Sequence, residues 1–181
     1  MQTPSGQPKA LLTGAVLAGE WVLDPRRSSI RLTNRSMLGL VRVKGAFGEF
    51  SGAGTVRADG TVSGTVTVAA ASIDTKNTRR DRHLRSADFF EVASHPDITF
   101  TADGVRLSGQ EVVVTGSLTV RDRTRPLSFA AAASVQDDEE IWLDAEVHVN
   151  RGDFGLTWNL MGLVAMDTTI TIHAAFIRRH R

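Results

Sequence analysis

The strongest constraint on the fold is an alternation of apolar and polar residues with a period of two. In residues 141–149 every odd position is apolar and the even positions are mostly polar, and residues 61–68 and 169–176 repeat the pattern. Successive side chains of a β-strand point to opposite faces, so each segment forms a strand with one dry face and one wet face. Helical heptads do not occur at length, and the alternation therefore predicts an all-β protein.

Turn sequences divide this pattern into separate strands. Asp59-Gly60 and Asp103-Gly104 are hairpin-type turns, and the acidic run 136–140 is typical of a solvated loop. The expected strands are 21–33, 40–57, 61–73, 97–103, 105–109, 111–120, 125–135 and 141–150, with 166–178 as a further strand. Many strands at regular spacing, without long helices, indicate a sandwich or a closed barrel.

Several of the expected strands are long, which predicts a tall barrel. Residues 61–73 alone would span roughly 40 Å at about 3.3 Å per residue. An eight-stranded barrel is just wide enough for its own side chains or for one small ligand. We therefore expect an elongated, antiparallel, eight-stranded barrel with one or two short helices, whose narrow interior suits an elongated guest.

Two segments depart from the alternation. Residues 76–91 have the composition of a short helix followed by a loop. Residues 152–165 form a glycine-rich insertion that carries Phe154, Trp158, Leu160 and Met161. An apolar loop beside a barrel mouth can serve as a lid or as a plug, and the sequence leaves both open.

Composition excludes several classes of function. The chain has no cysteine, which excludes disulfides, thiolate metal sites and cysteine nucleophiles. Its net charge of +1 gives no overall attraction to nucleic acid or to anionic membranes. No apolar run approaches the ~20 residues of a membrane-spanning helix.

The two ends of the chain are expected to lie outside the domain. Residues 1–19 contain one short apolar run, broken by Thr13 and Gly14, so they meet the pattern of a signal peptide only minimally. We interpret 1–19 as a flexible leader, 20–178 as the barrel and 179–181 as a frayed tail. A cytoplasmic location is favoured over export.

No group of residues has the pattern of a catalytic or metal site. The basic run of residues 76–85 precedes Phe89 and Phe90, a pair more typical of a helix anchored to the core than of a nucleic-acid reader. Three histidines have an acidic residue two positions away, and these pairs are His83 with Asp81, His95 with Asp97, and His148 with Glu146. Zinc requires three or four protein ligands, so we expect no metal, and no serine has the setting of a nucleophile.

Four segments together resemble the YceI-like family. They are Trp21–Pro25 with Ser28–Ile30 and Val43–Phe47; Ser72–Thr75 with Arg80–Phe90 and Pro96–Phe100; Gly116–Val120 with Thr124–Pro126; and Asn150–Leu156. All occur in the family order across residues 20–178. The resemblance implies a lipocalin-like barrel that holds isoprenoids or other long-chain amphiphiles in an apolar tunnel, without catalytic activity. It also implies a structural role for Arg80–His83, with Asp81 accepting from arginines or backbone donors.

The chain departs from this family at two positions. Arg27 replaces the histidine of the usual Asp-Pro-x-His-Ser sequence, and Ser36 stands where an Arg-His-Met triplet often has its histidine. The departures leave the identity of the ligand open.

These observations favour a carrier for a long-chain apolar small molecule. The expected lining residues are Leu32, Val43, Phe47, Phe100, Leu118 and Phe129, with Phe154, Trp158 and Met161 at the lid. No buried cation, cofactor or nucleic-acid partner is expected, and a homodimer remains open. One alternative is an enzyme using His148, Glu146 or Asp153 on a small apolar substrate. Another is a ligand-free structural or stress protein with a plugged interior.

Overall fold

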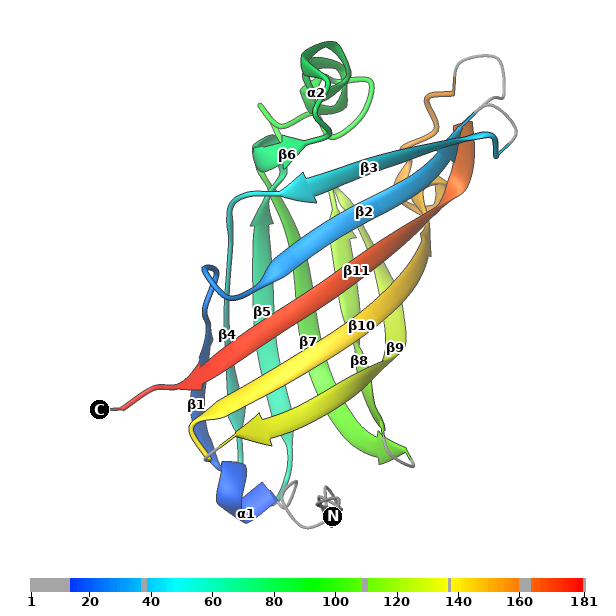
Figure 1. The fold of residues 1–181 in the computed structure, drawn as a ribbon. Helices are drawn as coiled ribbons and strands as arrows, with labels where there is room; N and C mark the ends of the chain where they lie inside the picture. Colours follow the sequence, from blue (N-terminus) through cyan, green and yellow to red (C-terminus); the bar gives the residue numbers. More distant parts are fainter. Residues whose placement is uncertain (1–13, 37–38, 109–110, 137, 160–163, 181) are drawn as a thin grey trace, which may run out of the picture.

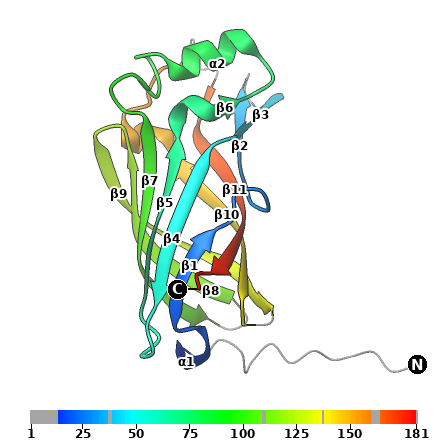
Figure 2. The same cartoon turned by 90° about the vertical axis from the view of Figure 1, so that its left-hand side faces the viewer.

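A single antiparallel sheet closes into a barrel in the computed structural model, which describes residues 14–36, 39–108, 111–136, 138–159 and 164–180. Figures 1 and 2 show the barrel from two sides, with one helix over its upper end. The strands are β1 (Gly19–Leu23), β2 (Ser29–Ser36), β3 (Val41–Phe47), β4 (Phe50–Val56), β5 (Val62–Ala69), β6 (Ile73–Asp74), β7 (Asp97–Ser108), β8 (Glu111–Val120), β9 (Arg123–Gln136), β10 (Glu140–Asn150) and β11 (Val164–Arg178).

Eight of these strands form the closed ring. Hydrogen bonds connect β1, β4, β5, β7, β8, β9, β10 and β11 in that order, and β11 pairs with β1 to complete the circle. The strand β11 has two partners along the edge that faces away from β10. It pairs with β2 from Val164 to His173 and with β1 from Phe176 to Arg178. The predicted eight-stranded antiparallel barrel is confirmed.

Three strands that we expected to be continuous are broken, so those boundaries were wrong. The segment 21–33 bends between β1 and β2, where Ser28 Oγ donates to the Asp24 carbonyl at 2.6 Å. The segment 40–57 is interrupted at Gly48, and 61–73 leaves the strand after Ala69 for a 3₁₀ turn at Ala70–Ser72. The height of the barrel comes instead from β9 and β11, which have 14 and 15 residues.

The predicted hairpin at Asp103-Gly104 was also wrong. Residues 97–108 form one strand, β7, with a bulge between Ala102 and Gly104 where the pairing with β8 shifts. A bulge inserts an extra residue without ending the strand. The turn at Asp59-Gly60 is confirmed, because the Arg57 nitrogen donates to the Thr61 carbonyl at 2.8 Å and Gly60 has a φ of 85°.

The helix α2 (Thr78–Arg85) covers the upper end of the barrel in Figure 1. Asn77 caps its start by accepting from the Arg80 backbone nitrogen at 3.0 Å. Phe90 follows the helix and is buried, with its ring 6.2 Å from that of Phe47. The expected anchoring of the basic segment by the two phenylalanines is therefore confirmed.

The helical turn α1 (Gly14–Leu17) lies at the lower end, next to the start of β1. Leu17 is buried there, and its carbonyl accepts from Trp21 Nε1 at 3.0 Å. This turn belongs to the segment that the sequence assigns to a leader. Among the described residues, no helix has the length and apolar composition needed to cross a membrane.

Candidate functional site

The candidate site is a cavity of about 620 Å³ that runs along the inside of the barrel. It extends from Leu17 and Trp21 near α1 to His83 and Trp158 near α2. The alternation of each strand accounts for its character, because the inward positions are mostly Val, Leu, Ile, Phe and Ala. A volume of this size is typical of a site for a small organic ligand.

All of the predicted lining residues that the structure describes lie on the wall of this cavity. Those that line the cavity are Leu32, Val43, Phe47, Phe100, Leu118, Phe129, Phe154 and Trp158. Met161 lies outside the described residues. Their contact with a ligand stays a prediction, since packing against neighbours also explains each position.

The two described members of the expected lid differ in burial. Phe154 is 5% exposed and belongs to the hydrophobic core, so it is part of the wall. Trp158 is 39% exposed, and its ring meets the His83 ring edge-on with centroids 4.1 Å apart. The contact joins the loop after β10 to α2 across the upper end of the cavity.

Arg151 lines the cavity as well, which corrects the expectation that no cation is buried inside. Its side chain donates to the backbone carbonyls of Leu156, Trp158, Val164 and Ala165. Burial lowers the pKa of the guanidinium, although arginine keeps its charge in proteins. The sequence indicated this inward position. The odd-numbered residues of 141–149 point inward, and Arg151 continues the same alternation two residues later.

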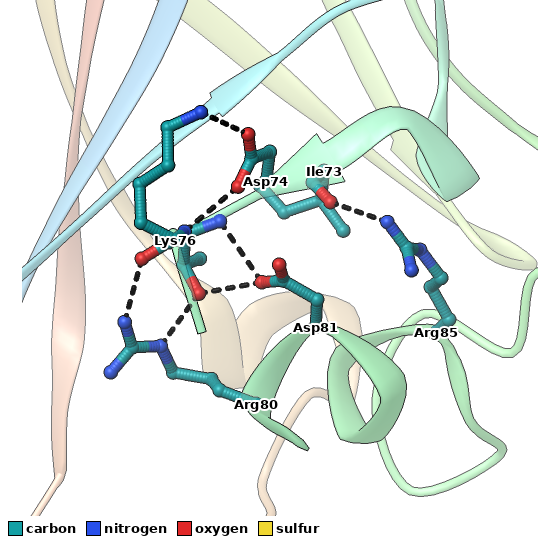
Figure 3. A network of polar contacts seen from close by, with 7 residues as sticks. Ile73, Asp74, Lys76, Arg80, Asp81 and Arg85 are labelled. Atoms are coloured by element: carbon teal, nitrogen blue, oxygen red, sulfur yellow. Dashed lines mark hydrogen bonds and ion pairs between the residues drawn. The ribbon is translucent and has the colours of Figure 1, made fainter. Parts of the chain in front are cut away.

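A polar network fixes the end of β6 to α2, as Figure 3 shows. Asp81 is 7% exposed and accepts from the backbone nitrogen of Thr75 at 2.9 Å and from its hydroxyl at 2.5 Å. Arg80 donates to the same hydroxyl at 2.7 Å and to the Thr75 carbonyl at 2.9 Å. The partner of Asp81 is thus a threonine and a backbone amide, not the surrounding arginines.

Replacement of Asp81 by alanine is expected to lower the free energy of unfolding by about 2–4 kcal/mol. The substitution leaves the buried amide and hydroxyl of Thr75 without an acceptor, which costs more than loss of an exposed contact. Urea unfolding followed by circular dichroism measures the change. Asp88→Ala is the control, because it removes the same charge from an exposed position of the same segment. Equal stability of both variants, with ligand binding lost only in Asp81→Ala, would assign Asp81 a role in binding instead.

The residues considered for catalysis lie away from the cavity. His148, Glu146 and Asp153 are exposed and do not line it. His148 approaches Glu146 at 3.5 Å, but His83 lies near Asp88 and His95 near Glu91, which corrects the other two expected pairs. Among the described residues, no three His, Asp or Glu side chains gather as metal ligands would.

The two departures from the family pattern lie in different settings. Arg27 forms two hydrogen bonds to Glu140, at 2.9 and 2.6 Å, and its guanidinium lies 5.0 Å from the centre of the Trp142 ring. This contact closes the bend between β1 and β2 against β10. Ser36 lines the upper end of the cavity.

Comparison with known proteins gives one family. The profile of the YceI-like domain matches residues 21–176. Protein YceI of Salmonella arizonae is 32% identical over 157 residues, which cover 82% of each chain. Protein YceI of Salmonella paratyphi B has the same identity and coverage.

Solved structures share the fold. The crystal structure of BcnA from Burkholderia cenocepacia has a TM-score of 0.77 at 21% identity, covering 84% of this chain and 98% of that one. A polyisoprenoid binding domain from Saccharophagus degradans, implicated in plant cell wall breakdown, has a TM-score of 0.72 at 13% identity, covering 88% and 98%. The YceI protein of Campylobacter jejuni has a TM-score of 0.66 at 23% identity, covering 78% and 88%.

Proposed function

Since the chain belongs to the YceI-like family, we propose that it is a carrier that holds an elongated apolar lipid in its tunnel without transforming it. The observation that carries the proposal is the mostly apolar cavity of about 620 Å³ that extends between α1 and α2. Burial of hydrocarbon in such a space is favourable by about 0.8 kcal/mol per methylene group. A long, narrow interior favours a chain-like guest over a compact one.

The polar groups along the cavity favour a guest with a small terminal group. Arg151 already donates to four carbonyls, so it is largely occupied by its own loop. Asn34 donates through Nδ2 to the Ala165 carbonyl and to Thr168 Oγ1, while its buried Oδ1 has no partner within the described part of the chain. That oxygen has no surface open to the cavity, so neither Arg151 nor Asn34 is placed to bind a large polar head group. The structural relative from Saccharophagus degradans is described as polyisoprenoid binding, which makes isoprenoid alcohols the first class to test.

Two observations argue against the alternatives. The side chains of the described residues leave the cavity unfilled, whereas a plugged structural protein would fill it. The acidic and histidine side chains weighed for catalysis are exposed on the outer surface. A cytoplasmic location for the carrier stays a proposal that rests on the N-terminal sequence.

The proposal is tested by extracting the purified protein with organic solvent and identifying co-purified lipids by mass spectrometry. Ala133→Trp should abolish or strongly reduce the bound lipid, because Ala133 faces the cavity and an indole would obstruct it. Ala132→Trp is the matched control, since Ala132 is the adjacent residue on the exposed face of β9. Equal lipid content in both variants, with both folded, would contradict the proposal.

A further inference from the structure

A basic ribbon with an apolar tip lies at the upper end of the barrel, and its outward face has no part in the proposed carrier function. We define this ribbon as β2 and β3 with the turn residues Gly39 and Leu40. Leu32 and Val43 point into the cavity, so the alternate residues Arg31, Arg35, Arg42 and Lys44 point outward, where all four are exposed. Figure 1 shows the ribbon rising toward the same end as α2.

The charges of the ribbon are not neutralised within the protein. Arg35 lies directly opposite Arg42 in the antiparallel register, and Lys44 is opposite Thr33. Like charges opposite one another destabilise a strand pair. None of the four cations forms an ion pair with a described carboxylate, although the exposed Asp167 lies on the neighbouring β11. The arrangement therefore favours an external anionic partner.

The tip of the ribbon is apolar and exposed. Leu40 is 86% exposed and Val41 is 43% exposed. Trp158 lies at the same end, because the next residue, Asn159, donates to the carbonyl of Val164, and Val164 pairs with Ser36 at the end of β2. These are three of the five large hydrophobic side chains that are exposed in the described part of the chain. Exposed aliphatic and tryptophan side chains flanked by cations are the composition of membrane-interface elements.

The two ends of the barrel differ in how their charges are paired. The whole chain carries a net charge of +1, so its attraction to an anionic surface must be local. In the turn at the opposite end, Glu139 and Glu140 pair with Arg178 and Arg27, so charges of both signs lie there. The four cations of the ribbon have no such partners among the described residues and provide a local attraction to a negatively charged surface.

We propose that this ribbon docks the protein on an anionic lipid membrane, with Leu40 and Val41 entering the interface and the four cations contacting lipid phosphates. Ser36 and Val164, which pair beside the tip, both line the cavity. Docking in this orientation brings the upper end of the tunnel to the membrane. A nucleic acid is disfavoured because the ribbon presents no exposed aromatic side chain for base stacking.

The test measures co-sedimentation of the full-length protein with vesicles of phosphatidylcholine, with and without phosphatidylglycerol. The unmodified protein should bind only the anionic vesicles, and high salt should weaken the binding. Arg35→Gln/Arg42→Gln should lower the affinity roughly 30-fold, since each basic residue near the surface contributes about a fivefold factor. Leu40→Ser should also weaken binding while leaving the charge unchanged.

The matched control is Arg57→Gln/Arg106→Gln, which removes two exposed cations from the other end of the barrel. It should change vesicle affinity less than about twofold, given the short range of screened charge. Ala133→Trp should still bind vesicles, so failure of docking and failure of lipid carriage are separable. The proposal is overturned if the control loses as much affinity as the ribbon variant, if neutral vesicles bind equally well, or if an oligonucleotide binds while vesicles do not. Thermal melting of each variant verifies folding.

Discussion

The affinity for a homologous series of isoprenoid alcohols is expected to rise about fourfold with each methylene-sized group that enters the tunnel, because each contributes about 0.8 kcal/mol. The rise should be steady, since the cavity wall is mostly apolar from Leu17 to Trp158. Across ten carbons the predicted gain is on the order of 10⁵-fold or more. This change in affinity is the largest effect expected for this protein.

The same series should reach a plateau when the tunnel is full. The plateau follows from the finite cavity of about 620 Å³, because carbons beyond its capacity stay in water. Titration followed by tryptophan fluorescence measures both the slope and the plateau, with Trp158 as the reporter at the cavity end. A response independent of chain length would end the carrier proposal. Trp21 also lines the cavity and will contribute to the signal.

Gly116→Ala is expected to lower the free energy of unfolding by about 2–4 kcal/mol, although it adds a single methyl group. A Cβ at position 116 would lie 2.2 Å from the Thr101 carbonyl oxygen and 2.9 Å from the Phe100 ring. Gly116 pairs with Ala102 beside the bulge of β7, where two backbones approach closely. To accommodate the methyl group, β7 or β8 would have to move.

Urea unfolding measures this change, and Gly48→Ala is its control. A Cβ at position 48 would meet only the Ser72 carbonyl, at 3.8 Å, and Gly48 has no positive φ. The control should therefore change stability by less than about 1 kcal/mol. If both variants are equally stable, the close approach of β7 and β8 is not present in solution.

The inward and outward faces of the strands could be predicted from the sequence because a period of two is a local property. In β10 the odd residues from Ile141 to Val149 line the cavity as expected, and the same period continues to Arg151. The lining positions Leu32 and Phe129 follow for the same reason. The alternation does not predict the hydrogen bonds of Arg151, because their acceptors are backbone carbonyls of residues that follow it in the chain.

Errors in the predicted strand boundaries arise in part from contacts that are distant in the sequence. Asp103-Gly104 has the composition of a hairpin turn, yet β8 pairs with β7 both before and after the bulge and keeps it extended, while β5 pairs with it as far as Ala102. The bend after β1 is held by Arg27 against Glu140, which lies far along the chain. Neither contact has a local signal, so neither could be predicted from the residues around it.

The pairing of β11 with both β1 and β2 determines when during protein synthesis the barrel can be completed. The three residue pairs between β1 and β11 join residues 21–23 to residues 176–178, near opposite ends of the chain. A nascent chain that lacks β11 can form the hairpins from β4 to β10, but its apolar inner surface stays open to water. Contacts of such large sequence separation form slowly. Until the last strand leaves the ribosome, this surface is therefore available to chaperones and to other nascent chains.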